Sequence, residues 1–133
     1  MEAKNLRIGN FVSDANASDS FFAQVKKLDY SRCYYGQFHS AYSDLKPIPL
    51  TKEWLDKFGF DDSEYKEGYT GIDYRTNLIM DFVLTKPNFM GEWQNYYTYD
   101  LGQHRFVALH YVHELQNLFF AVTATELELK AVV

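Results

Sequence analysis

The chain has 133 residues, a formal net charge of −5 and a single cysteine, Cys33. The charge argues against a general nucleic-acid binder, whose affinity comes largely from Lys and Arg on phosphates. One cysteine excludes an intrachain disulfide and favours a reduced, cytoplasmic setting. The length predicts one domain over residues 1–133. Residues 1–10 show no secretory signal, and no apolar run approaches the roughly 20 residues that span a bilayer, so we expect no membrane association.

Aromatic residues are unusually frequent and make up 18% of the chain, with eleven Tyr, eleven Phe and two Trp. Aromatic side chains favour strands, so the simplest explanation is a small β-rich core. The alternative is a contact surface, because Tyr and Trp are enriched where proteins bind other molecules.

The N-terminal third predicts three strands, over residues 6–12, 21–30 and 32–42. Small polar residues at 13–20 predict a loop after the first strand. Gly9 within that strand predicts a bulge or a sharp bend. This order is compatible with a small SH3-like barrel in the N-terminal part of the chain.

A short helix is predicted near residues 51–58. The prolines of segment 46–50 favour extended chain before it. Thr51 is a suitable N-cap, and Gly59 fits the left-handed position that ends helices. Three apolar side chains of this helix are expected to pack inward: Trp54, Leu55 and Phe58.

Strand patterns return after residue 65 and continue to residue 109. Polar and proline-containing segments predict turns between these strands, at residues 75–77, 86–88 and 100–103. The last two predicted strands are residues 93–99 and 105–109, and the second of them leads into a longer helix.

That longer helix is predicted near residues 111–123, within the sequence HYVHELQNLFFAVTATELEL. Apolar residues recur there at helical spacing: Val112, Leu115, Leu118, Phe119 and Val122. The other faces carry neutral hydrogen-bonding groups and a ring, so we expect the helix to be covered on more than one side or to line a pocket. Strands in runs followed by a helix predict an α+β fold with a mainly antiparallel sheet.

Three blocks of the sequence carry a family resemblance: LRIGNFV at 6–12, KPIPLTKEWLDKFGF at 46–60 and HYVHELQNLFFAVTATELEL at 110–129. They cover about a third of the chain and resemble a family of small uncharacterised proteins of Bacteroidetes phages, prophages and mobile elements. The resemblance implies a phage-type protein in the host cytoplasm. Phage accessory proteins often counter host defence by sequestering nucleotide signals or by binding a host protein.

Signatures of catalysis and of metal binding are scarce. The sequence holds no GxSxG elbow and no phosphate loop, and Cys33 in an aromatic segment reads as a small buried apolar residue. His110 and His113 lie three apart, and with His104 or Glu114 they allow a metal site to be sketched, but the HExxH spacing is missing. We therefore expect no catalytic residue, no metal and no cofactor.

The polar stripe of the longer helix is the first candidate ligand site. His113, Gln116 and Asn117 lie at i, i+3 and i+4, so they are neighbours on one surface. Covered amides need hydrogen-bond partners. Either these side chains bond to the backbone of a neighbouring loop and fix the fold, or they read the polar edges of a ligand.

The second candidate is the aromatic segment WQNYYTY. Strand alternation places Trp93, Tyr97 and Tyr99 on one face and Tyr96 on the other. One face is expected in the core, and the other is able to stack on a base. Arg105 is placed either to bind a phosphate or to form an ordinary surface ion pair.

These features favour a non-enzymatic small-molecule binding protein, and the sharpest version is a phage anti-defence protein that sequesters a nucleotide-type immune signal. The alternative is a protein–protein interaction module that inhibits a host or phage protein, which predicts an exposed aromatic patch rather than a concave pocket. A small hydrolase using His113 or His110 ranks last. Homo-oligomerisation is compatible with each of these.

Overall fold

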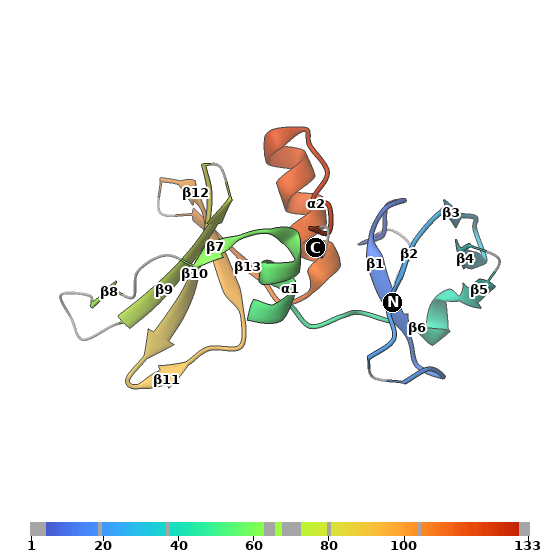
Figure 1. Ribbon diagram of the computed structural model, residues 1–133, viewed down its shortest axis with the longest axis horizontal. Helices are drawn as coiled ribbons and strands as arrows, with labels where there is room; N and C mark the ends of the chain where they lie inside the picture. The colour runs from blue at the N-terminus through green and yellow to red at the C-terminus, as the bar shows by residue number, and fades with distance from the viewer. Residues whose placement is uncertain are drawn as a thin grey trace. The chain divides into compact units, whose positions relative to one another are not determined.

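A computed structural model describes residues 5–18, 20–36, 38–62, 66–67, 73–79, 81–103 and 105–130, and for residues 62, 66–67 and 73–78 it describes the backbone alone. The fold is α+β with antiparallel sheets and two helices, which confirms the predicted fold class (Figure 1). The chain forms two compact units, Met1–Pro49 with Tyr111–Glu126 and Leu50–His110 with Leu127–Val133. A single domain over residues 1–133 stays a prediction.

Two three-stranded sheets make up most of the first unit. Their strand orders are β2-β1-β6 and β3-β4-β5, and all pairs are antiparallel. The strands are β1 (Phe11–Asp14), β2 (Ala23–Gln24), β3 (Lys27–Leu28), β4 (Arg32–Tyr35), β5 (Phe38–Ala41) and β6 (Leu45–Lys46). A 3-10 turn, Tyr42–Asp44, precedes β6. The last strand returns to pair with the first, an order compatible with the expected SH3-like arrangement.

The segment from β2 to β3 belongs to both sheets. The Val25 amide donates to the carbonyl of Asn10 at 2.8 Å, and the next amide, that of Lys26, donates to the carbonyl of Tyr34 at 2.8 Å. The chain therefore leaves one sheet and joins the other at residues 25–26, so the strand predicted over residues 21–30 is divided into β2 and β3. Gly9 has a φ of +99°, which confirms the predicted bend. The predicted bounds around it are wrong, because residues 6–10 form no strand and β1 extends into the predicted loop, to Asp14.

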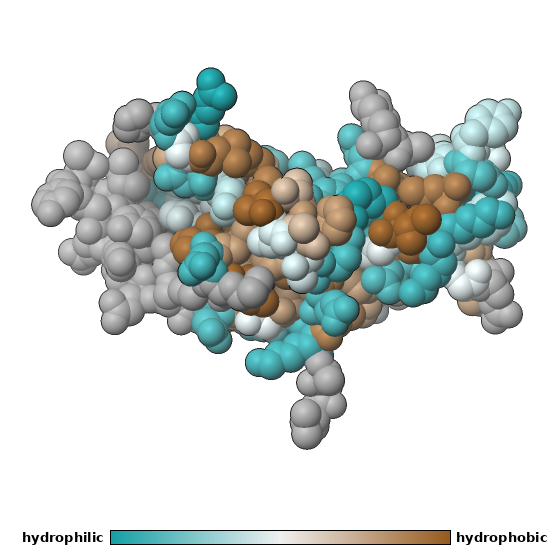
Figure 2. Space-filling model, turned by 90° about the horizontal axis from the view of Figure 1, so that it is seen from above, coloured by the Kyte–Doolittle hydropathy of each residue, from teal (hydrophilic) through white to brown (hydrophobic). Residues whose placement is uncertain are grey.

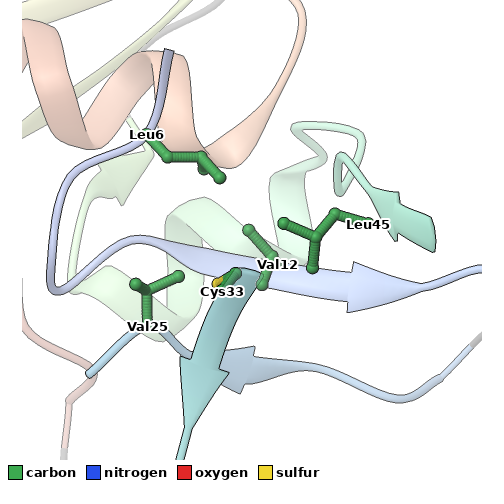
Figure 3. Close-up of a cluster of buried hydrophobic side chains, with 5 residues drawn as sticks. All are labelled: Leu6, Val12, Val25, Cys33 and Leu45. Carbon is green, nitrogen blue, oxygen red and sulfur yellow. The ribbon is translucent and has the colours of Figure 1, made fainter. Parts of the chain in front are cut away.

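The core of this unit lies between the two sheets. Five buried side chains form it: Leu6, Val12, Val25, Cys33 and Leu45 (Figure 3). Cys33 is fully buried as expected, and burial raises the pKa of its thiol to about 11. The thiol is therefore protonated at neutral pH and packs as a small apolar side chain.

Helix α2 (Val112–Thr123) completes the first unit and confirms the predicted longer helix. Val112, Leu115 and Phe119 of its apolar stripe are buried, whereas Val122 is exposed. His113 and Gln116 are buried as well, so two faces of the helix are covered. This agrees with the expectation drawn from its neutral polar faces.

Helix α1 (Lys52–Phe58) opens the second unit and confirms the short predicted helix. The Thr51 side chain accepts the amide of Trp54 at 3.4 Å, and Gly59 ends the helix at a φ of +89°. Its three expected core side chains, Trp54, Leu55 and Phe58, are buried.

One antiparallel sheet forms the rest of the second unit, with the order β13-β12-β10-β9-β7 (Figure 1). The short strands β11 and β8 pair with β10 and β9. The bounds are β7 (Asp61–Asp62), β8 (Lys66–Glu67), β9 (Asp73–Ile79), β10 (Phe82–Phe89), β11 (Glu92–Trp93), β12 (Tyr97–Gly102) and β13 (Arg105–Leu109). The last of these matches its predicted range.

Two predicted turns are wrong, because both lie within the longest hairpin of this sheet. Residues 75–77 are part of β9 and residues 86–88 part of β10, and the two segments pair with each other, Lys86 opposite Arg75. The chain reverses instead between Ile79 and Phe82, which pair with each other, and again at Met90 and Gly91, which have positive φ and join β10 to β11. The third predicted turn, at 100–103, begins later, because β12 continues to Gly102 with a bulge.

The faces of the sheet are set by alternation along β10. Phe82 and Leu84 are buried, and Val83 between them is 42% exposed. Phe82 stacks on Tyr99 of β12 with ring centroids 4.4 Å apart. Phe60, just after α1, meets the Phe82 ring edge-on, with ring centroids 6.3 Å apart. Phe82 therefore joins the sheet to the segment that follows α1.

Candidate functional site

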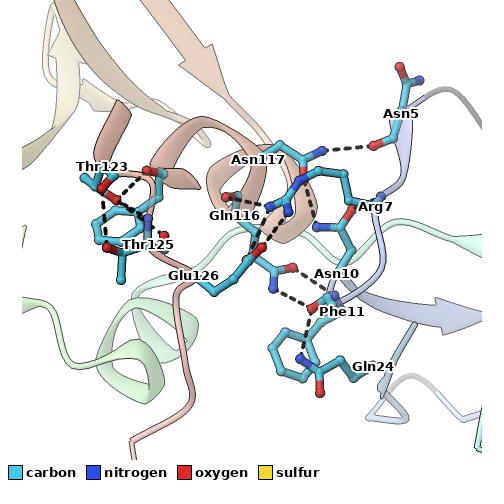
Figure 4. Close-up of polar contacts among 12 residues, drawn as sticks. Asn5, Arg7, Asn10, Phe11, Gln24, Gln116, Asn117, Thr123, Thr125 and Glu126 are labelled. Carbon is cyan, nitrogen blue, oxygen red and sulfur yellow. Dashed lines mark hydrogen bonds and ion pairs between the residues drawn. The ribbon is translucent and has the colours of Figure 1, made fainter. Parts of the chain in front are cut away.

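The Gln116 side chain of α2 bonds to the protein's own backbone through both its oxygen and its nitrogen. Its Oε1 accepts the amide of Phe11 at 2.8 Å, and its Nε2 donates to the carbonyl of Gly9 at 3.0 Å (Figure 4). Gly9 lies at the bend before β1, and Phe11 is the first residue of β1. One buried side-chain amide therefore fixes the start of the first strand to the helix. Of the two alternatives for Gln116, the structural one describes these contacts.

Asn117 bonds to the same N-terminal segment. Its Oδ1 accepts from Nε of Arg7 and from Nδ2 of Asn10, each at 2.8 Å, and its Nδ2 donates to the carbonyl of Asn5 at 3.0 Å (Figure 4). Asn10 is fully buried, and its Oδ1 accepts the amide of Arg7 at 2.7 Å. The side-chain amides of Gln116 and Asn117 thus bind the segment that leads into β1.

Arg7 links this loop to both ends of the α2 region. Its guanidinium forms an ion pair with Glu126 at 2.5 Å, donates to the carbonyl of Gln116 at 3.2 Å, and lies 4.6 Å from the ring centroid of Phe120. The LRIGN and HELQN segments therefore supply each other's interaction partners.

His113 differs from its two neighbours in the stripe. Its ring is buried and lies parallel to the Tyr111 ring at 6.0 Å, yet its Nδ1 has no hydrogen-bond partner among the described residues. Burial lowers the pKa of His113, and the charge of Glu114 partly offsets this effect. His113 is therefore neutral at physiological pH.

This burial predicts a pH-dependent stability. The ordinary pKa of histidine is near 6.5, so between that value and the lower pKa of the folded state the unfolded chain binds the extra proton. We expect the free energy of unfolding to be fully retained above pH 6.5 and to fall as the pH drops through this window. Urea unfolding at stepped pH measures it. In the variant His113→Leu the free energy of unfolding should depend less on pH, whereas the control His110→Gln, at an exposed position, should keep the wild-type dependence. If the pH dependence of His113→Leu equals that of the wild type, His113 is not its cause.

The aromatic segment 93–99 is divided by a loop, so its alternation does not run through. Trp93 belongs to β11, which pairs with β10 opposite Asn88, whereas Tyr97 begins β12. The intervening residues 94–96 form no strand. The expectation that Trp93 shares a strand face with Tyr97 and Tyr99 is therefore wrong.

Tyr97 and Tyr99 pack within the second unit. Tyr97 is buried, with Nζ of Lys86 5.6 Å from its ring centroid, and Tyr99 stacks on Phe82. Trp93 is half-buried, and Arg105 at the start of β13 is exposed. These four residues belong to the second unit, whereas His113, Gln116 and Asn117 belong to the first.

A cluster that sequence reasoning missed lies at the margin of the first unit's core. We call it the Tyr35 cluster; its members are Asp14, Phe21, Tyr35, Phe38 and Ser40. Tyr35 lies opposite Phe38 in the β4–β5 hairpin, and the two rings are stacked at 6.5 Å and 29°. The Phe21 ring is tilted against the Tyr35 ring, and their ring centroids lie 6.1 Å apart. Phe38 is 63% exposed, so the rings form a surface that begins in the core and ends in solvent.

The polar half of the Tyr35 cluster joins the two sheets. Oδ2 of Asp14, at the end of β1, accepts from the hydroxyls of Tyr35 (3.2 Å) and Ser40, and Oδ1 accepts the amide of Asn16 at 2.8 Å. The hydrogen bonds from Ser40 and Asn16 lower the pKa of Asp14. The carboxylate is therefore ionised at neutral pH, and it forms no ion pair with the described part of the chain.

The only sequence signal for this cluster was the aromatic segment 32–42, predicted as one strand. That prediction is wrong, because the segment forms two paired strands, β4 and β5, with Gly36 at positive φ between them. Nothing in the sequence linked Asp14, 26 residues earlier than Ser40, to that hairpin. Large hydrophobic side chains reach the surface in both units, and Figure 2 shows such groups between hydrophilic ones on one face.

The described residues hold no group of three or more His, Cys, Asp and Glu side chains placed to bind a metal ion, and His104 lies outside them. Within the same residues no helix is long and apolar enough to cross a membrane. No protein-family model, curated protein or solved structure matches the chain. The resemblance to phage and mobile-element proteins therefore stays an expectation.

Proposed function

We propose that this protein is a non-enzymatic protein-interaction module and that the Tyr35 cluster is its binding surface. The observation that carries the proposal is the 63% exposure of Phe38 at the end of a continuous row of three rings. Exposed aromatic side chains next to a well-packed core are typical of binding hot spots. An open patch of this kind is what the interaction alternative predicts, and small-ligand sites are usually enclosed.

The chemistry of the cluster supports binding rather than catalysis. Ser40 is the candidate nucleophile, but its hydroxyl donates to Asp14, whose pKa is lowered. A carboxylate with a lowered pKa is a weak general base, because an efficient base titrates near the working pH. The same contacts suit a rigid surface that holds its shape for a partner.

A nucleotide-type ligand remains the second candidate, and it would bind elsewhere on the chain. The ionised Asp14 repels phosphate, which directs such a ligand away from the Tyr35 cluster. In the second unit the exposed Arg105 and the half-buried Trp93 supply a guanidinium and a ring. Sequestration of a nucleotide signal would therefore use Trp93 and Arg105.

Selection of short random peptides displayed on phage tests the interaction proposal. The full-length protein is compared with Phe38→Ser and with Phe106→Ser, a matched control because Phe106 is 62% exposed on β13. We expect peptides to be enriched on the wild type and on Phe106→Ser but not on Phe38→Ser. Equal enrichment on all three proteins, or none on the wild type, contradicts the proposal.

Amide NMR shifts locate the surface directly. A selected peptide should shift the amides of residues 14, 21, 35, 38 and 40 in the full chain. Cyclic dinucleotides and ADP-ribose are titrated in parallel and recovered to check that they are chemically unchanged. Nucleotide-induced shifts around Trp93 and Arg105, without peptide-induced shifts at the Tyr35 cluster, would favour the second candidate instead.

A further inference from the structure

The Tyr35 cluster carries a negative charge that no basic group of the described residues balances. Oδ2 of Asp14 accepts from the hydroxyls of Tyr35 and Ser40, and Asn16 donates to the same carboxylate through its backbone amide and its side chain. These donors are neutral, and Asp14 forms no ion pair within the described residues. Because Asp14 is only partly buried, its charge is open to a cation from outside the chain.

Several rings of the chain are covered by a basic side chain, but among the described residues none covers the rings beside this carboxylate. Elsewhere the protein covers its own ring faces with basic groups: Arg7 over Phe120, Lys27 over Tyr34, Lys57 over Trp54 and Lys86 over Tyr97. Within the described residues no Lys or Arg lies over Phe21, Tyr35 or Phe38. Ring faces attract cations, and the hydroxyl of Tyr35 lies 3.2 Å from Asp14, so rings and carboxylate favour the same kind of group.

We propose that the partner presents a lysine or arginine side chain of a peptide segment, which packs its stem on Phe38 and Tyr35 and directs its charged end to Asp14. This inference rests on the proposed function. Charge complementarity selects the cation, and the long alkyl stem of a basic residue suits an apolar surface that ends at a charge. The 63% exposure of Phe38 selects a peptide over a free amine, because a small ligand needs enclosure to bind well.

The test measures dissociation constants by NMR titration of the full chain with defined probes. These are the blocked peptide Gly-Ala-Lys-Ala-Gly, the same peptide with acetyl-lysine, and tetramethylammonium chloride. We expect the lysine peptide to shift the cluster amides, and acetylation to weaken binding about fivefold, because an exposed cation–π contact and an ion pair are both lost. Added salt should weaken binding of the lysine peptide but not of the acetyl-lysine peptide.

Variants of the protein complete the design. Asp14→Asn should remove the preference for lysine over acetyl-lysine, and Asp44→Asn, which removes an exposed carboxylate of the 3-10 turn, should retain it. Phe38→Ser should abolish the shifts for every peptide. The comparison of the lysine and acetyl-lysine peptides uses the wild-type protein. It therefore tests the charge preference even if Asp14→Asn folds poorly.

Each other outcome overturns a separate statement. If both peptides shift the cluster equally and Asp14→Asn has no effect, the surface binds peptides but the inference about charge is wrong. If tetramethylammonium binds as tightly as the lysine peptide, the surface binds a small organic cation and the inference of a peptide is wrong. If peptides enriched by selection leave the cluster amides unshifted, the proposed function itself fails.

Discussion

Replacing Phe82 by alanine is expected to lower the free energy of unfolding by about 3–5 kcal/mol, the usual cost of deleting a fully buried aromatic ring. Phe82 is only 3% exposed, and its ring stacks on Tyr99 and contacts Phe60. The change removes both ring contacts and leaves a cavity between the sheet and the segment after α1. Urea unfolding followed by tyrosine and tryptophan fluorescence measures the loss.

The neighbouring residue supplies the matched control. Val83→Ala removes apolar atoms from the same strand, but Val83 points to the opposite face and is 42% exposed. We expect it to cost less than about 1 kcal/mol. Similar losses for the two variants would mean that the buried face of the sheet has been assigned to the wrong side, and Tyr99 would then be available as a binding ring.

The parts of the fold that were predictable from sequence are those whose limits are encoded locally. Thr51 and Gly59 bound helix α1. The Thr51 hydroxyl accepts the amide of Trp54 at the start of the helix, and Gly59 takes the left-handed conformation at its end. Helix α2 was placed by its continuous apolar periodicity, and strand β13 by its position between a predicted turn and that helix. Neither result requires knowledge of distant partners.

The turns within the β9–β10 hairpin show where local composition misleads. The Lys-Pro-Asn segment at 86–88 has the composition of a turn, but pairing with β9 holds it extended. Pro87 lacks an amide hydrogen, yet its carbonyl still accepts the amide of Gln94 at 2.9 Å. Strand β10 therefore continues through this segment and turns into β11 only at Met90 and Gly91, because pairing along β9 outweighs a local preference.

The candidate sites show the same limit more sharply. Helical spacing correctly made Gln116 and Asn117 neighbours, but Arg7, the partner of Asn117, lies 110 residues earlier in the chain. Asp14 and the β4–β5 hairpin meet only because β1 and that hairpin enclose one core. Periodicity predicts which side chains share a surface, and the tertiary fold decides what that surface faces.

Gln116→Ala is the prediction that separates a structural role of the α2 stripe from a ligand-binding one. We expect a loss of about 3 kcal/mol in the free energy of unfolding. Gln116 is 1% exposed, and the change removes the acceptor of the Phe11 amide and one donor to the Gly9 carbonyl. Each buried hydrogen-bonding group left unmatched costs about 1–3 kcal/mol, and the lost volume adds a cavity term.

The control on the same helix is Val122→Ala, which changes a 47% exposed side chain and should shift stability by no more than about 0.5 kcal/mol. A ligand-reading Gln116 would give the opposite pattern, with near-native stability and lost binding. If Gln116→Ala has the same free energy of unfolding as the wild type, the hydrogen bonds of Gln116 to Gly9 and Phe11 do not stabilise the fold. A large loss, with peptide-induced shifts still centred on the Tyr35 cluster in the folded fraction, would assign α2 to the fold and the hairpin surface to recognition.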